Sequence, residues 1–493
     1  MKLSEYIDYD ATELASLVRV GDVTPLELTH LARSAHDQVN SRINSIIEFY
    51  EDAETVAAAH GGPFHGVPFL RKDLGATEAG RLQECGSRLF KGHRPQTESY
   101  FIRRARESGL RIVGRTAVPE FGMSGMSESI LHGITGNPWN LERSAGGSSS
   151  GAAAAVASGI TPMAHGSDGG GSLRIPAAWC GLVGLNPSRG RVSGGPNKQD
   201  RSFGLSRDFI LCWTVRDMAA ALDTFSGPHP GDPFIIIQPH RTYMQELSQP
   251  TGTLKVGVAM TGWGAANVEP EVQQAVEATA ALLEEMGHTM IEIPTPYDLN
   301  EYYKGFAARS KYSADSLENE ARALGRQIDS STLEPLSLKL YEFGRSAQSA
   351  SLGDMFEAWR LTRFRVGEAL DPFDILLTPT MPVVAPPNDS TYRPTSETLS
   401  IDEYMEGARA LFPYMGVFNV TGHPSVSLPL AQSASGLPIG IQIVGRFGDE
   451  ATLVHVARDL EQARPGVIGG HRLEQERSNL LTTLMRRGQK QWR

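Results

Sequence analysis

Cysteine is scarce in this sequence: only Cys85, Cys180 and Cys212 occur among 493 residues, and no two of them form a CxxC pair. Three widely spaced cysteines support neither a disulfide framework nor a zinc knuckle, and they suit a reducing compartment. We interpret each as a small buried apolar side chain. No spacing of carboxylates or histidines indicates a catalytic metal, so we expect neither a metal nor another cofactor.

Long apolar runs and an excess of positive charge are also missing. No uninterrupted run approaches the ~18 residues that a transmembrane helix needs. Residues 1–20 carry four acidic side chains where a signal peptide would be basic and then apolar. The net charge of −10 argues against a surface for nucleic acid. We therefore expect a cytoplasmic protein with a small-molecule partner, without direct contact to nucleic acid or membrane, and we leave a homodimer open.

Apolar segments bounded by glycine or proline alternate with helix-patterned segments. This alternation predicts an α/β fold with a large β-sheet covered by helices on both faces. Thr24-Pro25-Leu26-Glu27 is a capping box that opens a helix. The other expected helices are 51–60, 98–108, 271–286, 449–462 and much of 301–369, and the expected strands are 66–70, 111–114, 254–259, 374–378, 417–430 and 437–444.

Two segments rich in glycine and serine stand out. Residues 144–158 read SAGGSSSGAAAAVAS, in which a Gly/Ser tract runs into strong helix-forming sequence. A flexible linker is the alternative, but this order favours a tight, ligand-facing turn at a helix N-terminus. Residues 166–176 read GSDGGGSLRIP, with three glycines before Ser172. No Gly-Lys-Ser/Thr follows, so an oxyanion hole beside a nucleophilic serine fits better than a phosphate loop.

A nucleophilic serine needs a base, and Lys72 lies at the end of the predicted strand 66–70. Lysine acts as a base only when it is neutral, a form that burial favours. From local sequence alone, a surface salt bridge between Lys72 and Asp73 is equally compatible. His165 precedes the glycine-rich loop, and we interpret it as a packed, hydrogen-bonded residue.

These segments resemble the amidase signature family, in order and approximate spacing, from the first helix to about residue 462. The resemblance is carried by GVPFLRKDL, GGSSSG, GSDGGGSLRIPA, GLVGLNPSRGRVS, FNVTGHPSVSLPL and GLPIGIQIVGRFGDEATLV. It implies the amidase signature fold, an α/β fold whose large mixed twisted β-sheet is covered by helices on both faces, as a single domain over 1–493. The catalytic core would comprise about 60–220 and 370–462, with a variable, largely helical region at about 300–369.

The resemblance also implies residue roles. Ser172 matches the nucleophile, Ser148 the bridging serine that follows a cis peptide bond, and Lys72 the base. Asp168 and Arg174 match structural partners of the nucleophile loop. The oxyanion hole matches the backbone of Gly169, Gly170, Gly171 and Ser172. The sequence departs from the family pattern at Ser150, where glycine is common, at Ser167, where threonine is, and at Asn186-Pro187-Ser188-Arg189, where Lys-Pro-Thr-Tyr is.

The motif sequences are most similar to those of the family branch that contains 6-aminohexanoate cyclic-dimer hydrolases, aryl-acylamidases and urethanases. This resemblance implies hydrolysis of C–N bonds in small-to-medium hydrophobic amides, anilides or carbamates through an acyl-enzyme, with urethanase or esterase side activity. The expected lining of the acyl pocket, for which core packing is an equal alternative, is Met123, Ser124, Gly125 and Met126. An aromatic group could form a lid, although we slightly prefer core packing; it comprises Tyr302, Tyr303, Phe306, Tyr341 and Phe343.

Other readings remain. Residues 147–151, GSSSG, satisfy the GxSxG elbow of α/β-hydrolases, with Ser149 as nucleophile, His423 or His455 as base and Asp374 as acid. The preceding residues 141–145 make a poor strand, which weakens that reading. The resemblance extends to the A subunit of the tRNA-dependent amidotransferase, which works only beside an RNA-binding partner. An inactive binding protein is the third alternative.

Overall fold

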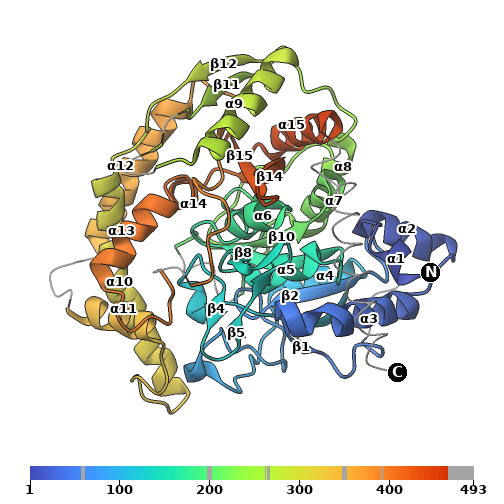
Figure 1. Cartoon of the computed structure of the whole chain (residues 1–493), viewed down its shortest axis with the longest axis horizontal. Helices are drawn as coiled ribbons and strands as arrows, with labels where there is room; N and C mark the ends of the chain where they lie inside the picture. Colours follow the sequence, from blue (N-terminus) through green and yellow to red (C-terminus); the bar gives the residue numbers. More distant parts are fainter. Residues whose placement is uncertain are drawn as a thin grey trace.

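The computed structural model describes residues 1–56, 61–196, 203–260, 262–263, 267–346, 352–389 and 392–464. Eleven strands form one continuous sheet through the middle of the molecule (Figure 1). Two hairpins, β4–β5 and β6–β7, form small sheets of their own at Glu128–Ser129 with Gly133–Ile134 and at Gly136–Asn137 with Asn140–Ser144. The strand order of the large sheet is β1 (Ile46–Phe49), β3 (Arg111–Thr116), β2 (Pro68–Lys72), β8 (Met163–Asp168), β10 (Arg207–Cys212), β9 (Val183–Asn186), β14 (Ser425–Gln432), β15 (Pro438–Gly445), β13 (Ile375–Pro379), β11 (Lys255–Val258) and β12 (Thr289–Glu292).

The sheet is mixed, as the family resemblance implies. β2 runs parallel to β3 and β8, and β11 runs parallel to β12 and β13, whereas the central strands pair antiparallel. The helices are α1 (Leu3–Tyr6), α2 (Ala11–Val20), α3 (Pro25–Ile43), α4 (Tyr100–Glu107), α5 (Ser150–Ala157), α6 (Arg174–Cys180), α7 (Val215–Phe225), α8 (Tyr243–Glu246), α9 (Pro270–Glu285), α10 (Leu299–Ala323), α11 (Pro335–Ser346), α12 (Leu352–Leu370), α13 (Ile401–Leu411), α14 (Gly416–Thr421) and α15 (Glu450–Ala463). The capping box predicted at Thr24 and Glu27 opens α3.

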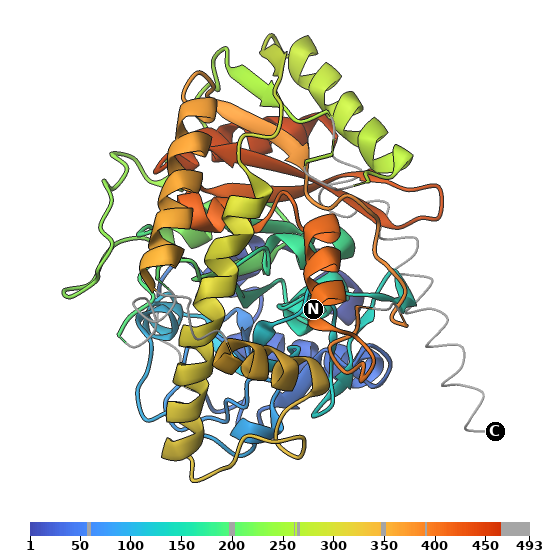
Figure 2. The same cartoon turned by 90° about the vertical axis from the view of Figure 1, so that its left-hand side faces the viewer.

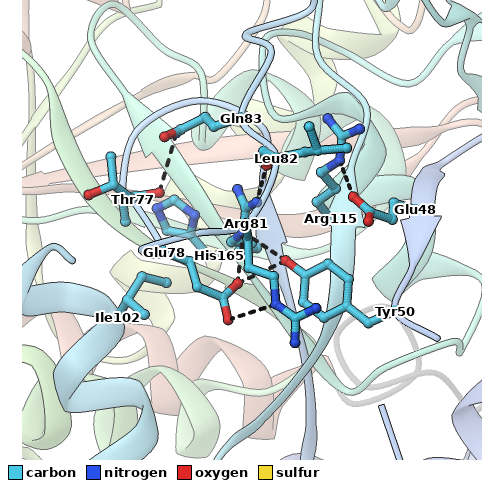
Figure 3. Close-up of polar contacts among 12 residues, drawn as sticks. Glu48, Tyr50, Thr77, Glu78, Arg81, Leu82, Gln83, Ile102, Arg115 and His165 are labelled. Carbon is cyan, nitrogen blue, oxygen red and sulfur yellow. Dashed lines mark hydrogen bonds and ion pairs between the residues drawn. The ribbon is translucent and has the colours of Figure 1, made fainter. Parts of the chain in front are cut away.

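Strand β2 shows how the two faces of the sheet differ. Successive side chains of a strand point to opposite faces. Lys72 reaches the N-terminal end of α5, where its Nζ lies 2.9 Å from Ser149 Oγ. Arg71 points the other way and joins Glu78, which pairs with Arg106 of α4. In Figure 3, Glu78 faces Tyr50 and Arg81, and Arg115 faces Glu48 nearby.

Helix α5 packs closely on the strands because its side chains are small. All eight of its residues, Ser150–Ala157, are buried. It contacts β8, β2, β3 and β10, and it packs against α6 on the same face. Alanine is the best helix former and allows close approach to the sheet. The linker reading of residues 144–158 is therefore wrong over Ser150–Ala157.

The long helices α10 and α12 pack side by side at one side of the molecule, away from α1–α3 (Figures 1 and 2). This agrees with the helical composition of 301–369. Within the described ranges, no helix is both long and apolar enough to cross a membrane.

Two sequence-based expectations are wrong in part. Residues 51–56 form turns rather than a helix, because Arg111 takes the carbonyls of Ala53 and Glu54; residues 57–60 lie outside the described part. The apolar run 417–430 is not one strand. It splits into α14 and β14 at Gly422, whose left-handed φ of 90° ends the helix.

Candidate active site

The side-chain nitrogen of Lys72 is buried and surrounded by serine oxygens. Its Nζ is 2.9 Å from Ser148 Oγ, 2.9 Å from Ser149 Oγ, 3.0 Å from Ser167 Oγ and 3.3 Å from the Ser167 carbonyl. The lysine is 0% exposed. Asp73 faces the opposite side of the sheet, where it bonds Arg115 at 2.9 Å. The Lys72–Asp73 surface salt bridge is therefore wrong, and the geometry suits a base directed at a hydroxyl.

Ser148 is held by a tight backbone approach. The Gly147–Ser148 peptide bond is cis, as the resemblance implied, and Ser148 is 2% exposed. The Gly147 N–H donates to the Gly125 carbonyl at 2.7 Å. A Cβ at position 147 would lie 2.3 Å from the Ser124 carbonyl oxygen, so only glycine fits there.

The expected pocket segment 123–126 therefore lies directly beside Ser148. Its members differ in exposure: Met123 is 38% exposed, whereas Ser124 and Met126 are buried. A Cβ on Gly125 would collide with the Phe412 ring. Met123 is the exposed member of this segment, and Met126 belongs to the core.

The glycine-rich loop between β8 and α6, which the resemblance assigns as the nucleophile loop, is fixed by a buried ion pair. Arg174 Nε and Nη2 donate to the two carboxylate oxygens of Asp168 at 2.9 and 3.0 Å. Asn419 bonds both partners, and Gln442 accepts from Arg174 at 2.8 Å. Burial alone would raise the pKa of the Asp168 carboxyl, but Arg174, Asn419 and the Gly171 N–H hold this pKa well below its usual range.

The same loop presents Ser172, which is partly exposed, together with free backbone donors. The Gly171 N–H is already taken, because it donates to Asp168 Oδ1 at 2.6 Å. Within the described residues, the N–H groups of Gly169, Gly170 and Ser172 make no hydrogen bond. Gly171 instead provides the turn: its φ is 127°, and a Cβ there would lie 2.8 Å from Ile175 Cδ1.

The α/β-hydrolase alternative is not assembled. The Ser149 hydroxyl lies against Lys72 and Ser167, whereas His423 Nδ1 contacts Thr421 and Asp374 pairs with Arg446. His455 contacts Glu246.

His165 is packed and hydrogen-bonded, as expected. It is 0% exposed, accepts from the Lys72 N–H at 3.2 Å through Nδ1, and faces Asp208 Oδ1 at 3.1 Å through Nε2. The Phe101 ring covers it at 4.8 Å between centroids.

The aromatic group of the helical region does not form one unit. Tyr302 is buried in a core cluster, with Tyr303 and Phe306 packed against that cluster. Tyr341 packs against a separate small cluster, and Phe343 is 38% exposed. Core packing, the slightly preferred reading, describes the first three residues.

Asn419 and Gln442 were not found by sequence reasoning. They are 251 and 268 residues from their partners Asp168 and Arg174. Both lie in segments that carry the family resemblance, FNVTGHPSVSLPL and GLPIGIQIVGRFGDEATLV, but no role was assigned to either residue.

This fold and site place the chain in a known class of hydrolases. The chain belongs to the amidase family, whose model matches residues 27–454. It is therefore an amidase signature hydrolase that acts on amide C–N bonds. It is 35% identical over 470 residues to the 6-aminohexanoate-cyclic-dimer hydrolase of Paenarthrobacter ureafaciens, covering 93% of this chain and 95% of that one. The substrate complex of a 6-aminohexanoate cyclic dimer hydrolase superposes with a TM-score of 0.87 at 32% identity, over 94% of this chain and 98% of the other. The structure of a bacterial aryl acylamidase superposes with a TM-score of 0.79 at 25% identity, over 94% of this chain and 99% of the other.

Proposed function

We propose that this protein, acting alone, hydrolyses small-to-medium hydrophobic amides, anilides or carbamates through Ser172, Ser148 and Lys72. One observation carries the proposal: the buried Lys72 Nζ lies 2.9 Å from the Ser148 hydroxyl, which follows the cis peptide bond beside the glycine-rich loop. The relatives support the amide class, since their names describe a cyclic amide dimer and an aryl amide.

The proposed reaction is a proton relay with an acyl-enzyme. Neutral Lys72 accepts a proton from Ser148 while Ser148 accepts one from Ser172, whose Oγ attacks the carbonyl carbon. The oxyanion is stabilised by the free N–H groups of Gly169, Gly170 and Ser172, and the loss of one such donor typically costs about 3–4 kcal/mol. Lys72 then returns the proton through Ser148 to the departing amine. Water hydrolyses the acyl-enzyme by the same relay.

The preference for hydrophobic substrates is supported by Met123, the exposed apolar side chain of the segment whose Gly125 carbonyl accepts from the Gly147 N–H. Methionine is flexible and adapts to varied acyl shapes. A carbamate passes through a similar tetrahedral oxyanion, so the same groups serve it. Esters are open to the same chemistry as a side activity.

The test is hydrolysis of a p-nitroanilide and a matched aryl carbamate by the purified full chain. We expect turnover in the wild type and a loss on the order of 10³-fold or more in Ser172→Ala, Ser148→Ala and Lys72→Ala. Comparing the two substrates ranks amide against carbamate.

The serine tract supplies a matched control. Ser150 is buried like Ser148, but its hydroxyl lies 3.5 Å from the Ala117 carbonyl. Ser150→Ala should keep most of the activity. Wild-type turnover by Lys72→Ala would overturn the relay. A well-folded wild type that is inactive on both substrates until partner subunits and ATP are added would favour the amidotransferase-subunit alternative.

A further inference from the structure

Three buried side chains behind the nucleophile loop carry polar atoms without a partner in the described part of the chain. They are Arg207 with Nε and Nη1, Asn186 with both amide atoms, and Ser425 with Oγ. Arg207 is 5% exposed, and the other two are 0% exposed. Buried polar groups are normally hydrogen-bonded, so three such side chains in one region call for a small bound partner, a water or an ion.

The three side chains share one face of the sheet. Asn186 of β9 lies directly opposite Ser425 of β14. Gly184, two residues before Asn186, lies opposite Leu211 of β10, and Arg207 is four residues before Leu211. Residues separated by an even number along a strand point to the same face, as do direct cross-strand neighbours.

The sheet opens where these residues lie. The ladder between β9 and β10 comprises the pairs Leu211–Gly184 and Cys212–Val183 and ends before Asn186 and Arg207. Arg207 also lies opposite Asp168, so the face is the one that carries the Asp168–Arg174 pair.

Positive charge gathers here, and no carboxylate of the described residues that acts on Arg207 is left unpaired. Arg207 Nη2 donates to the Asn419 carbonyl at 3.0 Å, and Arg189 Nη2 shares this carbonyl at 2.7 Å. Burial, then Arg207 and Arg189, lower the pKa of His423 to about 4. Asp168 is occupied by Arg174, and the nearby Glu450 is occupied by Arg191 at 2.9 Å. A buried guanidinium without an anionic partner is strongly unfavourable.

We propose that a single small monovalent anion, chloride in size and charge, binds between Arg207, Asn186 and Ser425. Arg207 Nε–H and Nη1–H and the Asn186 Nδ2–H donate to it, and the Ser425 hydroxyl completes the contacts. The polar atoms involved are closed to solvent, which excludes a substrate carboxylate. The ion neutralises Arg207, whose contact with Asn419 leads to Asp168 and the nucleophile loop.

Bromide locates the site directly. We expect crystals of the full chain grown in bromide to show an anomalous peak in hydrogen-bond contact with Arg207 and Asn186. A well-ordered region that holds only waters, without an anomalous peak, would overturn the proposal.

Variants test the charge. We compare melting temperatures in sodium chloride and in sodium gluconate at equal ionic strength, and we expect the wild type to be about 2 °C more stable in saturating chloride. Asn186→Asp places a carboxylate of the same shape beside Arg207. It should melt above the wild type in gluconate and lose the chloride response.

Arg207→Gln should lose the chloride response as well. If this variant does not fold, the bromide crystals and the melting temperatures of Asn186→Asp still test the proposal. The matched control is Arg360→Gln at an arginine whose side chain is 46% exposed, and it should respond to chloride as the wild type does. An Asn186→Asp protein that keeps the full chloride response would contradict the proposal.

Discussion

Arg71 and Lys72 are consecutive, equally buried cations on opposite faces of β2. Arg71 meets the Glu78 carboxylate at 3.0 Å and the Tyr50 hydroxyl at 2.9 Å. Lys72 meets four uncharged serine oxygens within 3.3 Å. A carboxylate favours the charged form of its partner, whereas burial disfavours charge. Burial is thus the same on both faces, whereas a carboxylate favours the charged form of Arg71 and serine oxygens surround the Lys72 nitrogen.

We call the two sides of β2 the lysine face and the arginine face, after Lys72 and Arg71. The largest expected effect on activity comes from a substitution on the lysine face. Lys72→Met keeps the side-chain volume but removes the proposed base, and kcat should fall on the order of 10⁴-fold. Stability should change by about 1 kcal/mol or less, since replacing a buried charge by an apolar group of similar size is often neutral. Turnover and urea unfolding of the same preparations check both statements. A large loss of stability would show that Lys72 is a structural cation like Arg71.

Asp168→Asn should have the next largest effect, because five donors converge on this carboxylate within 3.2 Å. We expect a loss of about 4 kcal/mol at pH 7, since Arg174 stays buried without its anion. The pKa of Asp168 in the folded chain lies below the unfolded value of about 3.9. Its stabilisation is therefore present above about pH 4 and is lost as the pH falls further.

Urea unfolding of wild type and variant between pH 7 and pH 3 measures this difference. The gap between the two proteins should narrow below pH 4. A constant gap would mean that the loss comes from packing rather than from charge.

Glu78→Gln tests the arginine face and should cost about 3 kcal/mol of unfolding free energy. The effect is smaller because two of its partners, Arg81 and Arg106, are 28% and 37% exposed and can turn to water. Turnover per folded molecule should stay near that of the wild type, because Glu78 lies on the face away from Lys72. Loss of turnover at full folding would show that the two faces are coupled through β2.

The contact of Lys72 with Ser148 could be predicted from the sequence, because both residues lie in local motifs that resemble the family. The alternation of strand and helix predicted the α/β class, and the resemblance implied the mixed sheet. The support behind the site was not predicted: Asn419 and Gln442 lie in motifs that resemble the family, but only the fold brings them to partners more than 250 residues away. The splitting of 417–430 depends on Gly422 adopting a left-handed φ, which an apolar run does not reveal.

The arginine face was less readable for a related reason. Glu78 follows Arg71 by only seven residues. Its other partners are distant in sequence: Tyr50 directly precedes the segment 51–60, and Arg106 lies in α4. Charged residues on a helix or loop are mostly solvated, so their pattern alone does not distinguish a rim residue from a buried partner.

Arg81→Gln should have the smallest effect. It tests the partly exposed Arg81–Asp52 pair, which we call the rim, against the buried Arg71–Glu78 pair. Arg81 lies 2.7 Å from Asp52, which is 52% exposed, and 4.2 Å above the Tyr50 ring. An exposed ion pair contributes about 0.2–1 kcal/mol, and the Arg81 guanidinium over the buried Tyr50 ring adds about 0.5–1 kcal/mol. We expect a total loss of about 1–2 kcal/mol at low salt, and its ion-pair part should shrink in 1 M NaCl, where the screening length falls to about 3 Å. The loss in Glu78→Gln should persist in 1 M NaCl, because its contact with Arg71 is closed to ions. If the stability losses of Arg81→Gln and Glu78→Gln shrink equally in salt, the Arg71–Glu78 pair is open to ions. The two pairs would then not differ in burial.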